Sequence, residues 1–95
     1  MIRHVIVFNA ERPLQEVRAM AQEAVRVLGS ISGVTDVRFG VAPAQEARYR
    51  YLFDIGLRDE AALAAYRANP VHVRFADERF RPLALDRITT DYLLE

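Results

Sequence analysis

The first strand that the sequence predicts is apolar on both of its faces. The run from Ile2 to Phe8 is rich in β-branched residues, a composition typical of strands. Because side chains alternate along a strand, its residues divide between two faces. One face holds Ile2, His4, Ile6 and Phe8, and the other holds Arg3, Val5 and Val7. Such a strand has to be covered on both sides, which limits the folds open to a chain of 95 residues.

A helix is expected at residues 13–28. Pro13 suits the first turn of a helix, and Gly29 is a natural stop. Between them, apolar residues recur at steps of three and four and form one stripe. The stripe consists of Leu14, Val17, Met20, Ala21, Ala24, Val25 and Leu28.

Two strands should follow this helix. Gly33 opens the first, which runs from Val34 to Phe39 and is closed by Gly40. The segment from Val41 to Ala47 contains a proline and several small or polar residues, and it predicts a loop. Residues 49–57 then alternate between two faces and give the clearest strand pattern in the chain.

The rest of the chain predicts two helical segments and a final strand. Asp59 is a good N-cap for the first segment. Asn69 and Pro70 interrupt it and favour a new helical start, which Pro82 limits. The last strand is expected at Asp86 to Leu94. The apolar positions of the first segment include Ala62, Leu63 and Tyr66. Candidates for the buried side of the second segment are Val73, Ala76, Phe80 and Leu83, and one face of the strand carries Ile88, Thr90, Tyr92 and Leu94.

This order of elements predicts an α+β fold with the ferredoxin-like βαββαβ plan, formed by a single domain of residues 1–95. The four strands would form an antiparallel sheet with helices on one face. No second helical layer remains for the other face, so exposed apolar sheet should act as an association site. A homodimer that packs sheet to sheet would cover it, since two-fold dimers are the commonest closed assemblies.

Composition excludes several classes of function. The 13 arginines, with no lysine, are balanced by 13 acidic residues, and without a basic excess we expect no nucleic-acid binding. The absence of cysteine excludes disulfides, thiolate nucleophiles and Cys-based zinc sites. No stretch is long enough to span a membrane, and the apolar start is too short for a signal peptide. We therefore expect a cytoplasmic protein without membrane contact.

His72 is the strongest candidate for chemistry. With Asn69 as N-cap and Pro70 as the first helical residue, His72 lies in the first turn of a helix, where the dipole disfavours imidazolium. A neutral imidazole can accept a proton as a general base. The alternative is an exposed and chemically idle side chain.

Tyr66 and His4 are two further candidates. The phenol of Tyr66, one turn before the Asn-Pro break, could donate a hydrogen bond to an enolate or oxyanion, or it could only seal the helix against the sheet. His4, in the middle of the first strand, could line a pocket as an acid, base or orienting donor. It could equally be a core or interface histidine with a satisfied hydrogen bond.

Motifs for metals, cofactors or nucleophilic serine are missing. Two histidines and a carboxylate are compatible with a metal in principle, but no metal-binding histidine spacing occurs. Ser30 and Ser32 fall in a turn that explains them, and the four glycines form no phosphate loop. We expect neither a metal nor a cofactor.

Three segments together resemble the stress-responsive A/B barrel (Dabb) family. They are the opening Arg-His-Val-Ile-Val-Phe, the Gly-Val-Thr-Asp-Val-Arg-Phe-Gly run at residues 33–40, and Tyr-Arg-Ala-Asn-Pro-Val-His at residues 66–72, followed by a terminal Asp-Tyr. The resemblance spans nearly the whole chain and keeps the order and spacing of the family. It implies a dimeric α+β barrel, with two sheets facing each other and the helices outside.

The resemblance also implies roles for the candidate residues. In the family, the strand-one histidine and a Tyr-x-x-His-Pro-x-His segment line a cavity between sheet and helices. Plant polyketide cyclases of the family use the tyrosine and last histidine for aldol ring closure, which correspond to Tyr66 and His72, with His4 nearby. This chain has Asn69 where the family often has histidine.

Three functions remain open at this point. The first is a non-catalytic, stress-related homodimer or one that binds a small hydrophobic ligand. The second is a cofactor-free cyclase or isomerase acting on a β-keto or polyketide-like substrate, with His72 as base, Tyr66 as oxyanion donor and His4 orienting a carbonyl or water. A haem-dependent or cofactor-free monooxygenase ranks last. Whether the protein is an enzyme at all stays open, because a shared fold does not confer function.

Overall fold

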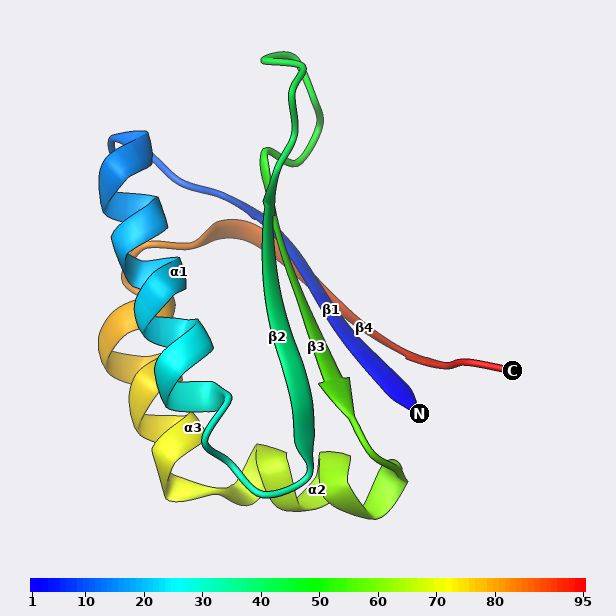
Figure 1. The fold of residues 1–95 in the computed structure, drawn as a ribbon. Coiled ribbons are helices and arrows are strands. Elements are labelled where there is room, and N and C mark those ends of the chain that lie inside the picture. Colours follow the sequence, from blue (N-terminus) through cyan, green and yellow to red (C-terminus); the bar gives the residue numbers. More distant parts are fainter.

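The computed structural model describes residues 1–95 and shows one sheet with helices packed against one of its faces (Figure 1). In chain order the elements are β1 (Ile2–Asn9), α1 (Leu14–Leu28), β2 (Val34–Val41), β3 (Tyr51–Leu57), α2 (Glu60–Ala68), α3 (Pro70–Phe75), the π-helical turn η1 (Ala76–Phe80) and β4 (Leu85–Leu93). The four strands lie in the order β2-β3-β1-β4, and all neighbours are antiparallel. The predicted ferredoxin-like α+β fold is confirmed.

Strand boundaries differ from the prediction by one or two residues, and the two-residue differences are at the end of β2 and the start of β3. β2 continues through Gly40 to Val41, because these residues pair with Leu52 and Tyr51 of β3. β3 begins at Tyr51 rather than at residue 49, where the pairing with β2 and β1 ends. Alternation of side chains therefore extends two residues beyond the ladder of hydrogen bonds.

The polar residues predicted to start helices do so. The Asp59 carboxylate accepts a hydrogen bond from the backbone N–H of Ala62 at 2.8 Å, at the start of α2. The Asn69 side-chain oxygen accepts one from the N–H of Val71 at 2.8 Å, at the start of α3. The direction of the chain at both ends of α2 is thus fixed by local sequence.

The expectation that Val73 is buried was wrong. Its side chain is 41% exposed, whereas Phe75 and Ala76 face the core. Residues at i, i+3 and i+4 share one side of a helix. The inward side of α3 is consequently formed by His72 with Phe75 and Ala76, and Val73 points outward.

An aromatic cluster forms the core between the sheet and the helices. Phe8 of β1 is fully buried, and its ring centroid lies 5.6 Å from that of Phe53 in β3 and 5.1 Å from that of Phe80 in η1. Rings at these separations gain from their mutual orientation as well as from burial. The cluster ties η1 to the sheet and so fixes the turn that follows His72.

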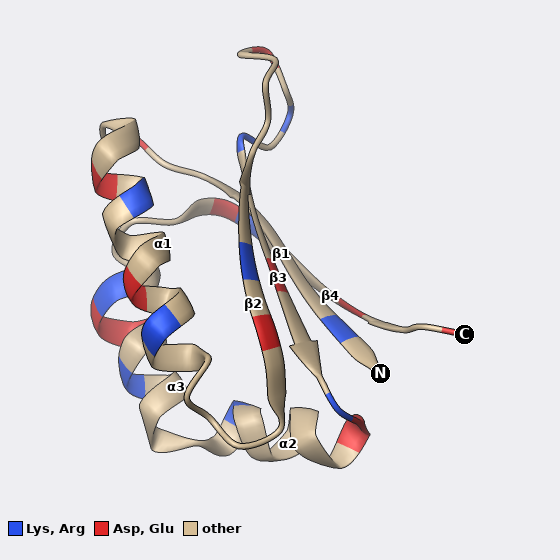
Figure 2. Ribbon diagram, in the orientation of Figure 1, with Lys and Arg blue, Asp and Glu red and all other residues tan.

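The uncovered face of the sheet is not apolar throughout, contrary to the expectation from β1. Arg3 donates hydrogen bonds to Asp36 of β2 and to Asp54 of β3, each at 2.8 Å, and only 12% of its side chain is exposed. The Arg3 hydrogen bond lowers the pKa of Asp36. Figure 2 shows charged positions next to each other across these three strands.

A glycine makes this ion cluster possible. Arg3 and Asp36 both lie opposite Gly56 of β3. A Cβ atom at Gly56 would lie 2.1 Å from Asp36 Oδ1 and 2.5 Å from Arg3 Nη1, so any larger residue would separate the pair. Beyond the cluster, the same face carries Val5, Val7 and Ile88, which remain an apolar strip. No helix of the chain has the length and apolar character required to cross a bilayer.

Candidate functional site

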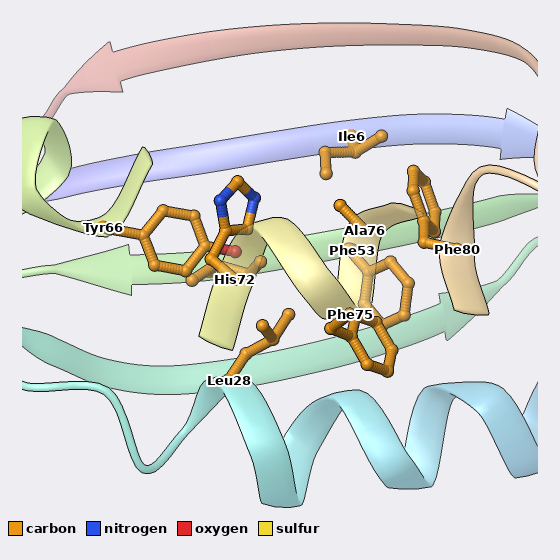
Figure 3. Close-up of a pocket in the computed structure, with 9 residues that line it drawn as sticks. Ile6, Leu28, Phe53, Tyr66, His72, Phe75, Ala76 and Phe80 are labelled. Atoms are coloured by element: carbon orange, nitrogen blue, oxygen red, sulfur yellow. The ribbon is translucent and has the colours of Figure 1, made fainter. Parts of the chain in front are cut away.

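A small, largely apolar cavity lies between the sheet and the segment formed by α3 and η1 (Figure 3). Its walls come from β1, β3, the end of α1, α2, α3 and η1. Two of the lining side chains, Tyr66 and His72, carry polar groups; the others are Ile6, Leu28, Phe53, Ile55, Phe75, Ala76 and Phe80. The volume is about 30 Å³, comparable with one or two water molecules.

Tyr66 lies in the last turn of α2 and is 1% exposed. Burial raises the pKa of its phenol well above 10, and no hydrogen bond contributes to that shift. The Tyr66 hydroxyl has no hydrogen-bond partner in the protein. Every fully buried side-chain oxygen or nitrogen does have one, so the Tyr66 oxygen keeps some accessible surface, and we assign this surface to the cavity that the residue lines. Figure 3 shows the hydroxyl end of the ring pointing toward His72. The phenol is a hydrogen-bond donor that no protein group uses.

His72 is the third helical residue of α3, as the sequence predicted. Its Nδ1 lies 3.3 Å from the backbone carbonyl of Arg67, where Nδ1–H donates and Nε2 is left with the lone pair. The ring centroid is 4.2 Å from that of Tyr66. Burial, the largest effect, lowers the pKa of His72 below its ordinary value of 6.5. Near neutral pH, Nε2 can therefore accept a proton.

His4 faces the same side of the sheet but is held by other residues. It is 6% exposed, and its Nδ1 hydrogen-bonds to Asp91, which lies opposite it on β4. The second oxygen of Asp91 pairs with Arg67 at the end of α2. The His4 ring meets the Tyr66 ring edge-on, with centroids 5.7 Å apart. The structure thus brings together all three predicted residues, with Tyr66 between the two histidines.

Asp91 and Arg67 were not recognised as site residues from the sequence. Their link to His4 depends on the pairing of β1 with β4, which joins residues 87 positions apart. Two signals were available: Asp91 lies in a predicted strand, and it belongs to the terminal Asp-Tyr pair that contributes to the family resemblance. No group of three or more His, Asp or Glu side chains is placed to hold a metal ion.

The arrangement is suited to acid–base chemistry on a small molecule. A neutral imidazole with a free lone pair lies beside a phenol with a free proton, in a largely apolar space. A base and an oxyanion donor on the same bound molecule are what proton abstraction next to a carbonyl requires.

Comparison with known proteins gives a family match over nearly the whole chain. The profile of the stress responsive A/B barrel domain, Dabb, matches residues 2–94. A search of functionally curated proteins found no match. Among solved structures, a Dabb family protein with a ferredoxin-like fold from Mesorhizobium loti is 27% identical, with a TM-score of 0.87, and the alignment covers 99% of this chain and 96% of that one.

Two more distant structures share the fold. A dimeric ferredoxin-like protein of unknown function from Thermobifida fusca is 21% identical, with a TM-score of 0.82 and coverage of 98% of this chain and 90% of that one. A hydroxynitrile lyase from Passiflora edulis is 15% identical, with a TM-score of 0.83 and coverage of 99% and 93%. The fold is therefore found both in an enzyme and in a protein without a known activity.

Proposed function

This chain belongs to the stress-responsive A/B barrel (Dabb) domain family, and we propose that it is a cofactor-free acid–base catalyst acting on a small β-keto compound. One observation carries the proposal. The lone pair of His72 and the unpartnered hydroxyl of Tyr66 face one cavity, with ring centroids 4.2 Å apart. The hydroxynitrile lyase with the same fold is a precedent for an enzyme on this scaffold.

The reaction would begin with His72. Its Nε2 lone pair takes the proton from a carbon between two carbonyl groups, and the electrons of the C–H bond move into the adjacent carbonyl to form an enolate. The Tyr66 O–H donates a hydrogen bond to the enolate oxygen. In a substrate with a third, more distant carbonyl group, the carbanionic carbon then attacks that carbonyl, whose oxygen receives the proton from imidazolium. Return of the proton to another position of the enolate would be an isomerisation instead.

His4 acts here as a positioning residue. Its ring lies edge-on against Tyr66 and is itself held by Asp91 and, through Asp91, by Arg67. This chain of contacts joins β1, β4 and α2 around the phenol. It fixes the Tyr66 ring where its hydroxyl meets the cavity.

A second candidate is a protein that binds a small hydrophobic ligand without turning it over. The largely apolar lining of the cavity favours it, because the sites of small-molecule ligands are lined mostly by hydrophobic side chains. The two candidates differ in one measurable property, which is proton transfer to a bound molecule.

Hydrogen exchange on a neutral β-keto ester tests the proposal. In D₂O, the wild-type protein should accelerate loss of the ¹H NMR signal of the C2 protons of ethyl acetoacetate. The lowered pKa of His72 means that the rate should fall with decreasing pH as the base becomes protonated, with a midpoint below pH 6.5. The raised pKa of Tyr66 keeps the donor protonated, so no second decline should occur below pH 10. No acceleration over buffer, or a midpoint above pH 7, would rule out this role for His72.

The functional unit is a homodimer formed through the uncovered sheet face. The apolar strip of Val5, Val7 and Ile88 supports this, as Ile88 is 49% exposed in the single chain. The neighbour from Thermobifida fusca is a dimer with the same fold. Packing of two sheets would cover the strip and leave the helices and the cavity on the side of each sheet that faces away from the dimer interface.

Ile88→Asp should convert the dimer to a monomer without unfolding it, because the residue is exposed within the protomer and a carboxylate cannot be buried unpaired. Sedimentation at several protein concentrations should give a dimer dissociation constant at least about tenfold higher than that of wild type. Val71→Asp is the matched control, since Val71 is 43% exposed on the helical side. A monomeric wild-type protein, or equal effects of both variants, would contradict the sheet-face dimer.

A further inference from the structure

A second, wider cleft adjoins the apolar cavity and is lined by cationic side chains. Its volume is about 330 Å³, and its polar lining includes Arg67, Arg81, Arg87 and both histidines. It shares His72 with the apolar cavity, together with Ile6, Ala76 and Phe80. A molecule lying in the cleft can therefore reach the imidazole and extend beyond it into the apolar space.

The charged side chains that line this cleft are all basic, although the chain as a whole has zero net charge. None of the residues that line it is acidic. Arg67 is paired with Asp91, and Arg81 pairs with Asp77, whose side chain is exposed and does not line the cleft. Arg87 makes no ion pair in the structure. At least one full positive charge therefore faces the cleft without a partner in the protein.

The fold gives no other reason for this cluster. Arg67 comes from the end of α2, Arg81 follows η1, and Arg87 belongs to β4, so three separate parts of the chain direct guanidinium groups to one place. Unlike Arg3 on the opposite face, Arg81 and Arg87 hold no strands together. The hydroxyl-bearing Thr89 lies beside them in the same lining.

We infer that the substrate of the acid–base site is a small carboxylate with a short apolar chain. Arg81 and Arg87 bind the carboxylate in the wide cleft, where planar guanidinium groups match its two oxygens. The chain passes His72, and its apolar end enters the cavity beside Tyr66. The inference rests on the proposed function for the chemistry, and it adds the class of molecule that this chemistry would act upon.

Binding can be measured without turnover by titrating ¹⁵N-labelled protein with hexanoate and with its neutral isostere hexanamide. Hexanoate should bind at least about tenfold more tightly, as expected for charge-assisted hydrogen bonds. Arg81→Gln and Arg87→Gln should each weaken hexanoate binding by about tenfold and leave hexanamide binding unchanged. Arg74→Gln is the matched control, because Arg74 also forms an exposed i,i+4 pair, with Glu78, but lies outside the cleft.

Three outcomes would overturn the inference. They are equal affinities for hexanoate and hexanamide, an equal loss in Arg74→Gln, and tighter binding of hexyl phosphate than of hexanoate, which would assign the cleft to phosphate esters. Its failure is distinguishable from that of the proposed function. A protein that exchanges protons of neutral ethyl acetoacetate but ignores hexanoate loses only the inference, and one that binds hexanoate without exchanging protons loses only the catalysis.

Discussion

Replacing His72 with glutamine should lower kcat/KM for proton transfer by about 10²–10⁴-fold. Glutamine is uncharged and polar and can keep a hydrogen bond to the Arg67 carbonyl, but it has no basic lone pair. The loss should appear at every pH above the wild-type midpoint, since the neutral imidazole is the active form there. The initial rate of exchange on ethyl acetoacetate provides the measurement.

Val73→Ala is the control for this substitution. Val73 is the next residue of α3 and points outward, so its loss leaves the cavity intact. Its rate should match that of wild type. A His72→Gln variant that keeps the wild-type rate and pH profile would show that another group takes the proton. Loss of rate together with loss of folded signal in the circular dichroism spectrum would call for His72→Asn as a second variant, and retained activity in that variant would count equally against the role of His72.

The parts of the site that were predictable from sequence depend on neighbouring residues. Asn69 and Pro70 end one helix and start the next, which brings Tyr66 and His72 to opposite sides of a single bend. The two rings meet because the residues are six positions apart in the sequence, on either side of that break. Short-range spacing and capping chemistry were enough to pair them as candidates.

The parts that were missed depend on register or on irregular backbone. The contact of His4 with Asp91 requires β1 and β4 to pair in one alignment, and a shift by one residue would turn Asp91 to the other face. The Arg3 cluster requires alignment of three strands around Gly56. Arg81 reaches the cleft after a π-helical turn, and no motif in the sequence predicts that turn. Long-range pairing sets these contacts, and periodicity within a segment carries no information on it.

The core beneath the site should be the most sensitive part of the molecule to truncation. Phe8→Ala removes a ring that is fully buried against Phe53, Phe80 and Tyr51, and it should lower the free energy of unfolding by about 3–5 kcal/mol. Domains have a total stability of only about 5–15 kcal/mol, so a sizeable part of it would be lost. Urea unfolding followed by circular dichroism measures the change, at one fixed protein concentration because dimerisation contributes to stability.

The same variant separates the support of the cavity from its chemistry. Phe53 and Phe80 line the cavity, whereas Phe8 packs against both rings and is not itself a lining residue. Where Phe8→Ala still folds, loosened walls should raise KM for ethyl acetoacetate and leave the pH midpoint of the rate unchanged, since His72 keeps its own contacts. Tyr49→Ala, which removes a half-buried ring from the loop before β3, should cost only about 1 kcal/mol. A Phe8→Ala variant as stable as Tyr49→Ala would mean that the aromatic cluster does not hold η1 and the sheet together.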